Sequence, residues 1–131
     1  MKRKWLYGIA GLALILCAVA LPLLLPSRPF RSLTAGELRS ASVELLPPGQ
    51  VLEIADTEEL ARLLQEVVVY RQDDSYDSYS AQAVIFTLQL TDGSQVEVTA
   101  YNPFLVIDGV GYRTKYGPCE ALSRFANRLL P

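Results

Sequence analysis

Hydrophobic residues follow three different patterns along this chain, and each pattern predicts a different kind of element. No charged residue occurs from Trp5 to Leu25. About twenty apolar residues in a helix span roughly 30 Å, which is the thickness of a bilayer's hydrocarbon core. Later stretches place apolar residues either at helical spacing or at every second position. The sequence therefore predicts an N-terminal transmembrane helix followed by a domain that contains both helices and strands.

The alternating pattern is clearest between residues 83 and 115. Every second residue from Val84 to Leu90 is apolar, and the alternation resumes from Val96 to Ala100. Asp92-Gly93 and Asp108-Gly109 are typical signals of hairpin turns. We expect a meander of four antiparallel strands in this region.

Helical spacing appears once before and once after the predicted meander. Asp56 and Glu59 have the spacing of a capping box at the start of the first helix. The apolar stripes are Leu60, Leu63, Leu64, Val67 and Val68 in the first helix and Leu122, Phe125, Ala126, Leu129 and Leu130 in the second. The expected fold is a two-layer α+β domain, an antiparallel meander sheet with two amphipathic helices on one face.

The predicted elements divide the chain into three parts. Residues 1–26 form a signal anchor, residues 27–32 an extended linker, and residues 33–131 one extracytoplasmic α+β domain. Near the start of that domain, the capping box Thr34–Glu37 predicts a short helical turn. Pro47-Pro48-Gly49 then predicts a turn between two short strands.

Basic residues before the apolar segment indicate its orientation. Lys2-Arg3-Lys4 favours a cytoplasmic N-terminus and thus a single-pass protein of the cell membrane. Two alternatives stay open. One is cleavage after Ala20 and secretion, because Ala18-Val19-Ala20 has the small-x-small form. The other is lipidation of Cys17, where Leu16 occupies the place of the usual small residue. All three outcomes put the domain outside the cytoplasm.

Charge and composition exclude several classes of function. The formal net charge is −2, but nine basic and fourteen acidic residues follow from Ser27 onward, so the domain itself carries −5. An acidic domain without a basic stripe argues against binding nucleic acid or anionic lipid headgroups. The chain has no histidine, which removes Ser-His-Asp and Cys-His catalysis and the usual zinc ligand sets. We expect no catalytic, metal or cofactor site, and therefore not an enzyme.

Tyrosines supply the candidate binding surface. Tyrosine is enriched at binding surfaces because it combines a rigid apolar ring with a polar tip. The tyrosines predicted in loops or on the outer strand face are Tyr76, Tyr79, Tyr101, Tyr112 and Tyr116. Together they predict a surface for an envelope protein or a peptide.

Two other sets of residues have chemical potential. Asp73, Ser75 and Asp77 alternate as calcium ligands do, but the loop lacks the glycine at the sixth position and the later bidentate glutamate of a calcium loop. A solvated loop is the favoured interpretation. Cys119, the one thiol of the domain, stands in the first turn of the last helix, where a thiol pKa is lowered. We expect it to be a buried packing residue, since free cysteines are commonly buried.

The order of these elements resembles a known group of proteins. The residues that carry the resemblance are Phe30-Arg31-Ser32-Leu33-Thr34, Ile54-Ala55-Asp56-Thr57-Glu58-Glu59-Leu60, Leu90-Thr91-Asp92-Gly93, and Ile107-Asp108-Gly109 followed by Tyr112. They resemble small uncharacterised membrane-anchored proteins of Gram-positive bacteria, grouped as domains of unknown function. The resemblance implies location and fold, and it supplies no functional residue.

The leading hypothesis from the sequence is a membrane-tethered extracytoplasmic module that binds a partner without catalysis. The membrane contact is residues 5–25, and the partner is an envelope protein or peptide. A regulatory or sensor domain of the cell envelope is one alternative. An unusual enzyme that uses carboxylates or Cys119 is another.

Overall fold

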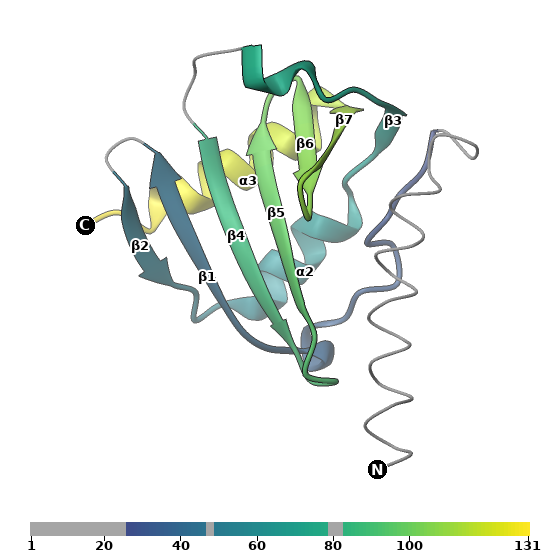
Figure 1. Ribbon diagram of the computed structural model, residues 1–131. Helices are drawn as coiled ribbons and strands as arrows, with labels where there is room; N and C mark the ends of the chain where they lie inside the picture. Colours follow the sequence, from purple (N-terminus) through teal and green to yellow (C-terminus); the bar gives the residue numbers. More distant parts are fainter. Residues whose placement is uncertain (1–25, 47–48, 79–82) are drawn as a thin grey trace.

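The computed structural model describes residues 26–46, 49–78 and 83–131. The predicted signal anchor and its three processing outcomes lie outside these residues, as do Pro47, Pro48 and Tyr79. The described part of the chain is an α+β domain with an antiparallel seven-stranded sheet and two α-helices (Figure 1). The predicted fold class is confirmed at this level.

The predicted helices and meander strands occur in the predicted order, but Val67 and Val68 are not part of the first helix, which ends at Gln65. In chain order they are η2 (Ala35–Glu37), β1 (Leu38–Leu46), β2 (Gln50–Glu53), α2 (Thr57–Gln65), β3 (Val69–Gln72), η3 (Ser75–Ser78), β4 (Ala83–Leu90), β5 (Gln95–Tyr101), β6 (Phe104–Ile107), β7 (Val110–Thr114) and α3 (Tyr116–Arg128). The predicted four-strand meander is β4 to β7. The sheet is larger than predicted because the β1–β2 hairpin and β3 join it.

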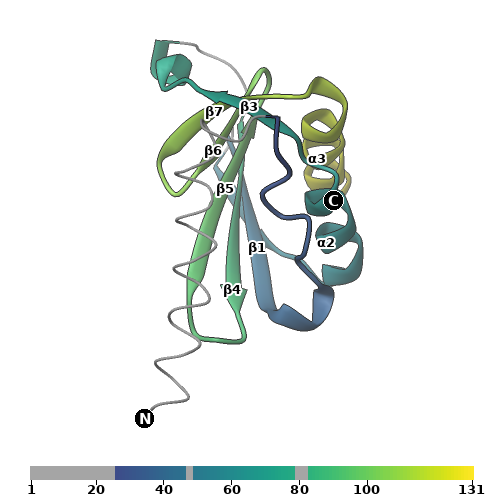
Figure 2. The ribbon, with the colours of Figure 1, turned by 90° about the vertical axis from the view of Figure 1, so that its right-hand side faces the viewer.

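Every neighbouring pair of strands in the sheet is antiparallel, and the order is β2-β1-β4-β5-β6-β7-β3. The short strands β2 and β3 are thus the two edges. Both α2 and α3 lie on one face of the sheet, and neither of these two α-helices covers the other face (Figure 2). We call these the inner and the outer face.

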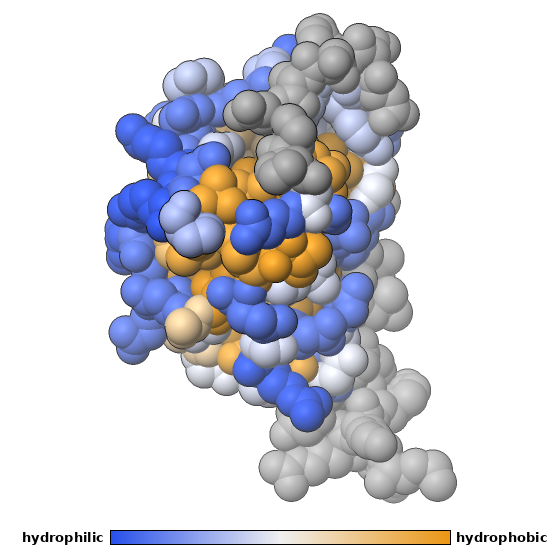
Figure 3. Space-filling model, turned by 90° about the vertical axis from the view of Figure 1, so that its left-hand side faces the viewer, coloured by the Kyte–Doolittle hydropathy of each residue, from blue (hydrophilic) through white to orange (hydrophobic). Residues whose placement is uncertain are grey.

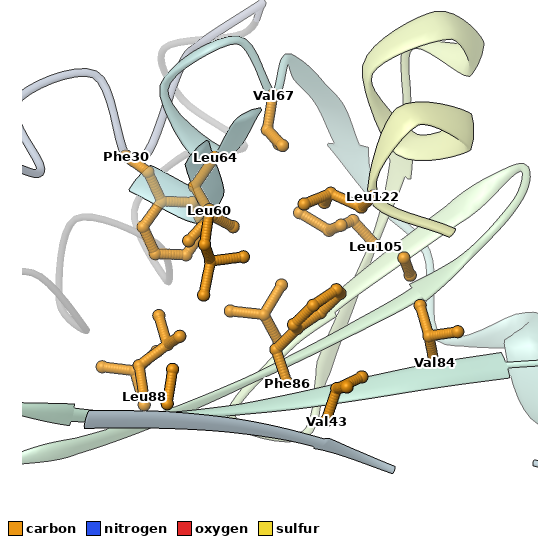
Figure 4. Close-up of a cluster of buried hydrophobic side chains, with 14 of the residues drawn as sticks. Phe30, Val43, Leu60, Leu64, Val67, Val84, Phe86, Leu88, Leu105 and Leu122 are labelled. Carbon is orange, nitrogen blue, oxygen red and sulfur yellow. The ribbon is translucent and has the colours of Figure 1, made fainter. Parts of the chain in front are cut away.

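The core lies between the inner face and the helices. Val43, Phe86 and Val98 occupy adjacent positions across β1, β4 and β5, and all three are fully buried. Leu60 and Leu122 meet them from α2 and α3 (Figure 4). The apolar residues at every second position of the strands and those at helical spacing in α2 and α3 therefore form one core.

Local signals in the sequence form the expected turns and caps. Asp108 and Gly109 have φ angles of 47° and 85° in the two-residue β6–β7 turn, and positive φ at both positions is typical of a type I′ hairpin. The Asp56 carboxylate accepts a hydrogen bond of 3.0 Å from the Glu59 N–H and caps α2. The Glu59 side chain pairs with Arg128 on α3 at 3.2 Å, so it links the two helices.

The packed domain begins earlier than the predicted boundary at residue 33. Ser27 and Val69 exchange two backbone hydrogen bonds of 3.0 and 2.8 Å, so Ser27 lies along the β3 edge. The Arg28 guanidinium donates to the Gln65 carbonyl at the end of α2. Phe30 is fully buried beside Leu60 (Figure 4). Residues 27–32 are therefore part of the domain, because an aromatic side chain in this segment completes the core.

Candidate functional site

The structure does not bring the predicted tyrosines to one surface. Tyr79 lies outside the described residues, and the other four have different environments. Tyr116 is 66% exposed at the start of α3, whereas Tyr101 is 8% exposed. Tyr76 is half-buried over Phe104, with 6.5 Å between the ring centroids. Tyr112 is fully buried.

The expected position of Tyr112 on the outer face is wrong. The register pairs Tyr112 with Leu105, and Leu105 with Ala100, and all three side chains belong to the buried core. The turn at residues 108–109 fixes this register, and a shift by one residue would have reversed the face. Burial, followed by the negative charge of Asp74, raises the pKa of Tyr112.

The acidic segment 73–78, which we call the strap, lies against the β6–β7 hairpin. The backbone N–H of Asp73 donates to the Gly111 carbonyl at 2.8 Å, and the Gly111 N–H donates to the Asp74 carboxylate at 2.8 Å. The Tyr76 hydroxyl donates to the Gly109 carbonyl at 3.4 Å. The strap is thus attached to the sheet through Asp73, Asp74 and Tyr76, while Asp74 and Ser75 remain exposed to solvent.

A charged pair attaches the strap to the outer face. The Arg113 Nε donates to the Asp73 carboxylate at 2.8 Å, and its guanidinium lies 4.6 Å from the Phe104 ring centroid. The other Asp73 carboxylate oxygen accepts from the Ser75 N–H. The hydrogen bonds from Ser75, followed by Arg113, hold the pKa of Asp73 well below its ordinary range.

These contacts engage Asp73, the first of the three residues considered as calcium ligands. Both oxygens of Asp73 accept hydrogen bonds from protein donors. The side chain of Asp77 lies outside the described residues. In the part of the chain that the structure describes, no three His, Cys, Asp or Glu residues are grouped so that they could hold a metal ion.

The strap approaches the sheet closely because residue 111 is glycine. A Cβ at Gly111 would lie 2.6 Å from the Asp73 carbonyl oxygen and 2.7 Å from Cδ1 of Tyr76. Non-bonded carbon atoms normally stay about 3.5–4.0 Å apart. Any larger side chain at residue 111 would therefore displace the strap.

Cys119 is a packing residue, as the sequence predicts. Its side chain is fully buried, and the thiol points to the Phe104 carbonyl at 3.6 Å. Burial raises the pKa of the Cys119 thiol to about 12. This shift outweighs the effect of the helix N-terminus, so the thiolate that a nucleophile needs is strongly disfavoured.

The described surface that most resembles a binding site is the free edge of β2, which sequence reasoning did not single out. Val51 is 62% exposed, and Leu46 at the end of β1 is 38% exposed. On the inner side of the same edge, Leu52 is half-buried, and the chain end that follows α3, with half-buried Leu129 and Leu130, lies on this side of the domain (Figure 1). We call these five residues the open edge. Figure 3 shows apolar side chains gathered on this side of the molecule, bordered by polar ones.

Carboxylates lie beside the open edge on the outer face. Glu53 follows Val51 on the same side of β2, and Glu44 is the direct partner of Val51 on β1. Strands β2, β4 and β5 contain no lysine or arginine. The one basic residue of β1, Arg39, precedes the stretch that pairs with β2. The outer face next to the open edge is therefore acidic as well as apolar.

A second hollow, between α2 and α3, is less suited to binding. It is an open groove of about 610 Å³ lined by Glu59, Leu63, Ala121, Arg124, Asn127 and Arg128. The Glu59 carboxylate is shared by Arg62 and Arg128 at 3.5 and 3.2 Å. The groove is wide open to solvent, whereas binding pockets usually enclose most of a ligand's surface.

Comparison of the chain with protein-family models, curated proteins and solved structures finds no match. The site is therefore interpreted from its own geometry. Among the residues that the structure describes, none of the helices has the length and apolar character needed to cross a membrane.

Proposed function

We propose that this chain is a membrane-tethered extracytoplasmic module that binds a protein or peptide without catalysis, and that the open edge is its binding surface. The tether is the apolar segment from Trp5 to Leu25. The observation that carries the proposal is the exposure of Val51 on the edge strand β2 and of Leu46 at the end of the neighbouring strand β1.

An edge strand offers two kinds of contact to a partner. Its outward N–H and C=O groups can pair with another extended chain. Its side chains, on the two faces of the sheet, can pack against the side chains of that chain. Each side of β2 offers an apolar side chain, Val51 on the outer side and Leu52 on the inner side. Contiguous exposed apolar surface tends to mark an interaction site.

Site-specific photo-crosslinking in intact cells tests this proposal. A photoreactive amino acid at Leu46 should form a defined adduct, and the second substitution Val51→Lys should abolish it. The same amino acid at Thr87, on the outer face but away from the edge, is the matched control. If Leu46 and Thr87 give the same adducts, or if Val51→Lys leaves the adduct intact, the open edge is not the binding surface.

A second candidate function is a regulatory or sensor domain of the cell envelope. It is favoured by the attachment of Ser27, Arg28 and Phe30 to the domain, because a segment that follows the tether and is packed against the domain can transmit a change between the two. Hydrogen exchange distinguishes the two functions. Partner binding at β2 should alter exchange of the Val69 amide in a sensor and leave it unchanged in a simple binding module.

A further inference from the structure

We infer that the open edge binds an extended partner segment in which apolar and basic side chains alternate. This inference rests on the proposed function, to which it adds the chemistry of the partner. It follows from the backbone register of β2, the side chains on its two flanks, and the charge of the outer face.

Within the described ranges 26–46, 49–78 and 83–131, no segment pairs with the backbone of β2 on the side away from β1. The Ile54 N–H donates to the Ala41 carbonyl at 2.9 Å. In an antiparallel pair, bonded and non-bonded positions alternate, so Leu52 also faces β1, and the N–H and C=O groups of Val51 and Glu53 point outward. A partner strand can therefore form a ladder with these two residues.

The side chains of an added strand would point alternately to the inner and the outer face of the sheet, and they would find different surroundings on each face. On the inner side, the alternate residues of an added strand would lie next to Leu52 and would face the chain end after α3. Leu52, Leu129 and Leu130 are all only half-buried. Apolar residues there would complete the burial of these leucines. The inner positions of the partner are therefore apolar.

On the outer flank, the partner would meet an apolar residue between carboxylates. Val51 lies beside Glu44, and Glu53 follows on the same side. A lysine or arginine suits this environment, because its aliphatic stem packs on an apolar side chain while its charge stays near a carboxylate. Opposite charges directly across a strand pair stabilise it, and like charges destabilise it.

The same charges disfavour a second copy of this chain as the partner. Pairing of β2 with its own copy would bring Glu44 and Glu53 of both molecules to the same interface. Strands β2, β4 and β5 carry no basic residue that could compensate. Like charges on neighbouring strands oppose the pairing, so a basic segment of another protein is favoured.

Binding of defined peptides to the full-length chain in nanodiscs of zwitterionic lipid tests the inference. The probe is a short, blocked, fluorescent peptide that alternates valine and lysine, and fluorescence anisotropy reports its binding. A valine–glutamate peptide of the same length and a peptide with its valines and lysines in separate blocks are the peptide controls. Empty nanodiscs measure adsorption to lipid.

Charge reversal at two matched positions tests whether peptide binding depends on the carboxylates of the open edge. Glu53→Lys should lower the affinity for the valine–lysine peptide about fivefold or more, since one exposed ion pair contributes about 1 kcal/mol. Glu97→Lys makes the same change in the same cross-strand row, because Glu97 pairs with Thr87, Thr87 with Ser42, and Ser42 with Glu53. It lies three strands away, about 14 Å, and should change binding less than twofold.

The outcomes separate this inference from the proposed function. Tight binding of the valine–lysine peptide alone, lost in Glu53→Lys and kept in Glu97→Lys, supports it. Equal losses in the two variants, or equal binding of the valine–glutamate or block peptide, overturns it. If no peptide binds while the Leu46 adduct persists in cells, the partner chemistry is wrong and the proposed function stands. A Leu46 adduct between two copies of this chain also overturns the inference.

Discussion

The two edges of the sheet are built from similar short strands but have opposite surroundings. At β3, Ser27 pairs with Val69, the Arg28 guanidinium donates to the end of α2, and Phe30 fills the core beneath. At β2, Val51 is exposed, and no described segment pairs with its outer side. Exposed strand edges invite pairing with other chains. The difference indicates that the β3 edge serves attachment within the chain and the β2 edge serves a partner.

Removal of the aromatic side chain at the closed edge should have the largest effect. Phe30→Ala should lower the free energy of unfolding by about 3–5 kcal/mol, because a buried phenylalanine leaves a large cavity. Urea unfolding followed by circular dichroism measures the loss. The exposed neighbour Arg31 is the control, and Arg31→Ala should stay within about 0.5 kcal/mol. Equal stabilities of the two variants would mean that residues 27–32 do behave as a linker.

A matched pair of valines compares the two edges directly. Val69 on β3 is fully buried and Val51 on β2 is largely exposed. Val69→Ala should cost about 2–3 kcal/mol, from the apolar surface removed and the cavity left. Val51→Ala should change the free energy of unfolding by less than about 0.5 kcal/mol. A large loss in Val51→Ala would show that the open edge is covered within the chain itself.

The strap, which follows β3 along the chain, gives a further comparison. Gly111→Ala places a Cβ within 3 Å of Asp73 and Tyr76, so we expect a cost of about 1–3 kcal/mol and faster proteolysis within the strap. Gly117→Ala is the matched control, since a Cβ there meets no heavy atom within 4 Å. Should both variants resist protease equally, the close contact at Gly111 does not hold the strap.

The smallest effect should be a change in the pH dependence of stability. The pKa of Asp73 is lowered in the folded state, so its stabilising contribution is present above its unfolded pKa of about 3.9 and is lost as the pH falls below that value. Asp73→Asn should therefore be less stable than the wild type at neutral pH, and the difference should shrink in acid. Unfolding midpoints across this range measure it. Glu58→Gln, which removes a carboxylate at an exposed position of α2, is the matched control.

The sequence predicted most elements of the domain because their signals are local. The alternation from Val84 to Leu90 defines β4 and its buried face, and Asp108-Gly109 defines the turn between β6 and β7. The Asp56 cap marks the start of α2. The sequence did not predict that β1–β2 and β3 join the meander, because pairing between strands distant in the chain leaves no local pattern.

The candidate site could not be predicted for the same reason. Tyr112 and Tyr101 look like exposed binding residues in the sequence, but the register of β7 and the packing on the outer face bury them. Val51 and Leu46 look like core residues and lie at a free edge instead. The extension of the apolar stripe to Leu129 and Leu130 at the end of the last helix was the available signal, since these residues need a surface to cover.

The sequence by itself determined the apolar N-terminal segment, the acidic charge of the domain, the absence of histidine, and the order of its helices and strands. These depend on composition and on periods of two and 3.6 residues, which any short window reveals. Only the tertiary structure decided which strands became edges, that residues 27–32 close one of them, and that the other presents apolar surface between carboxylates. Those features depend on contacts between residues distant in the chain, which form only when the sheet is assembled.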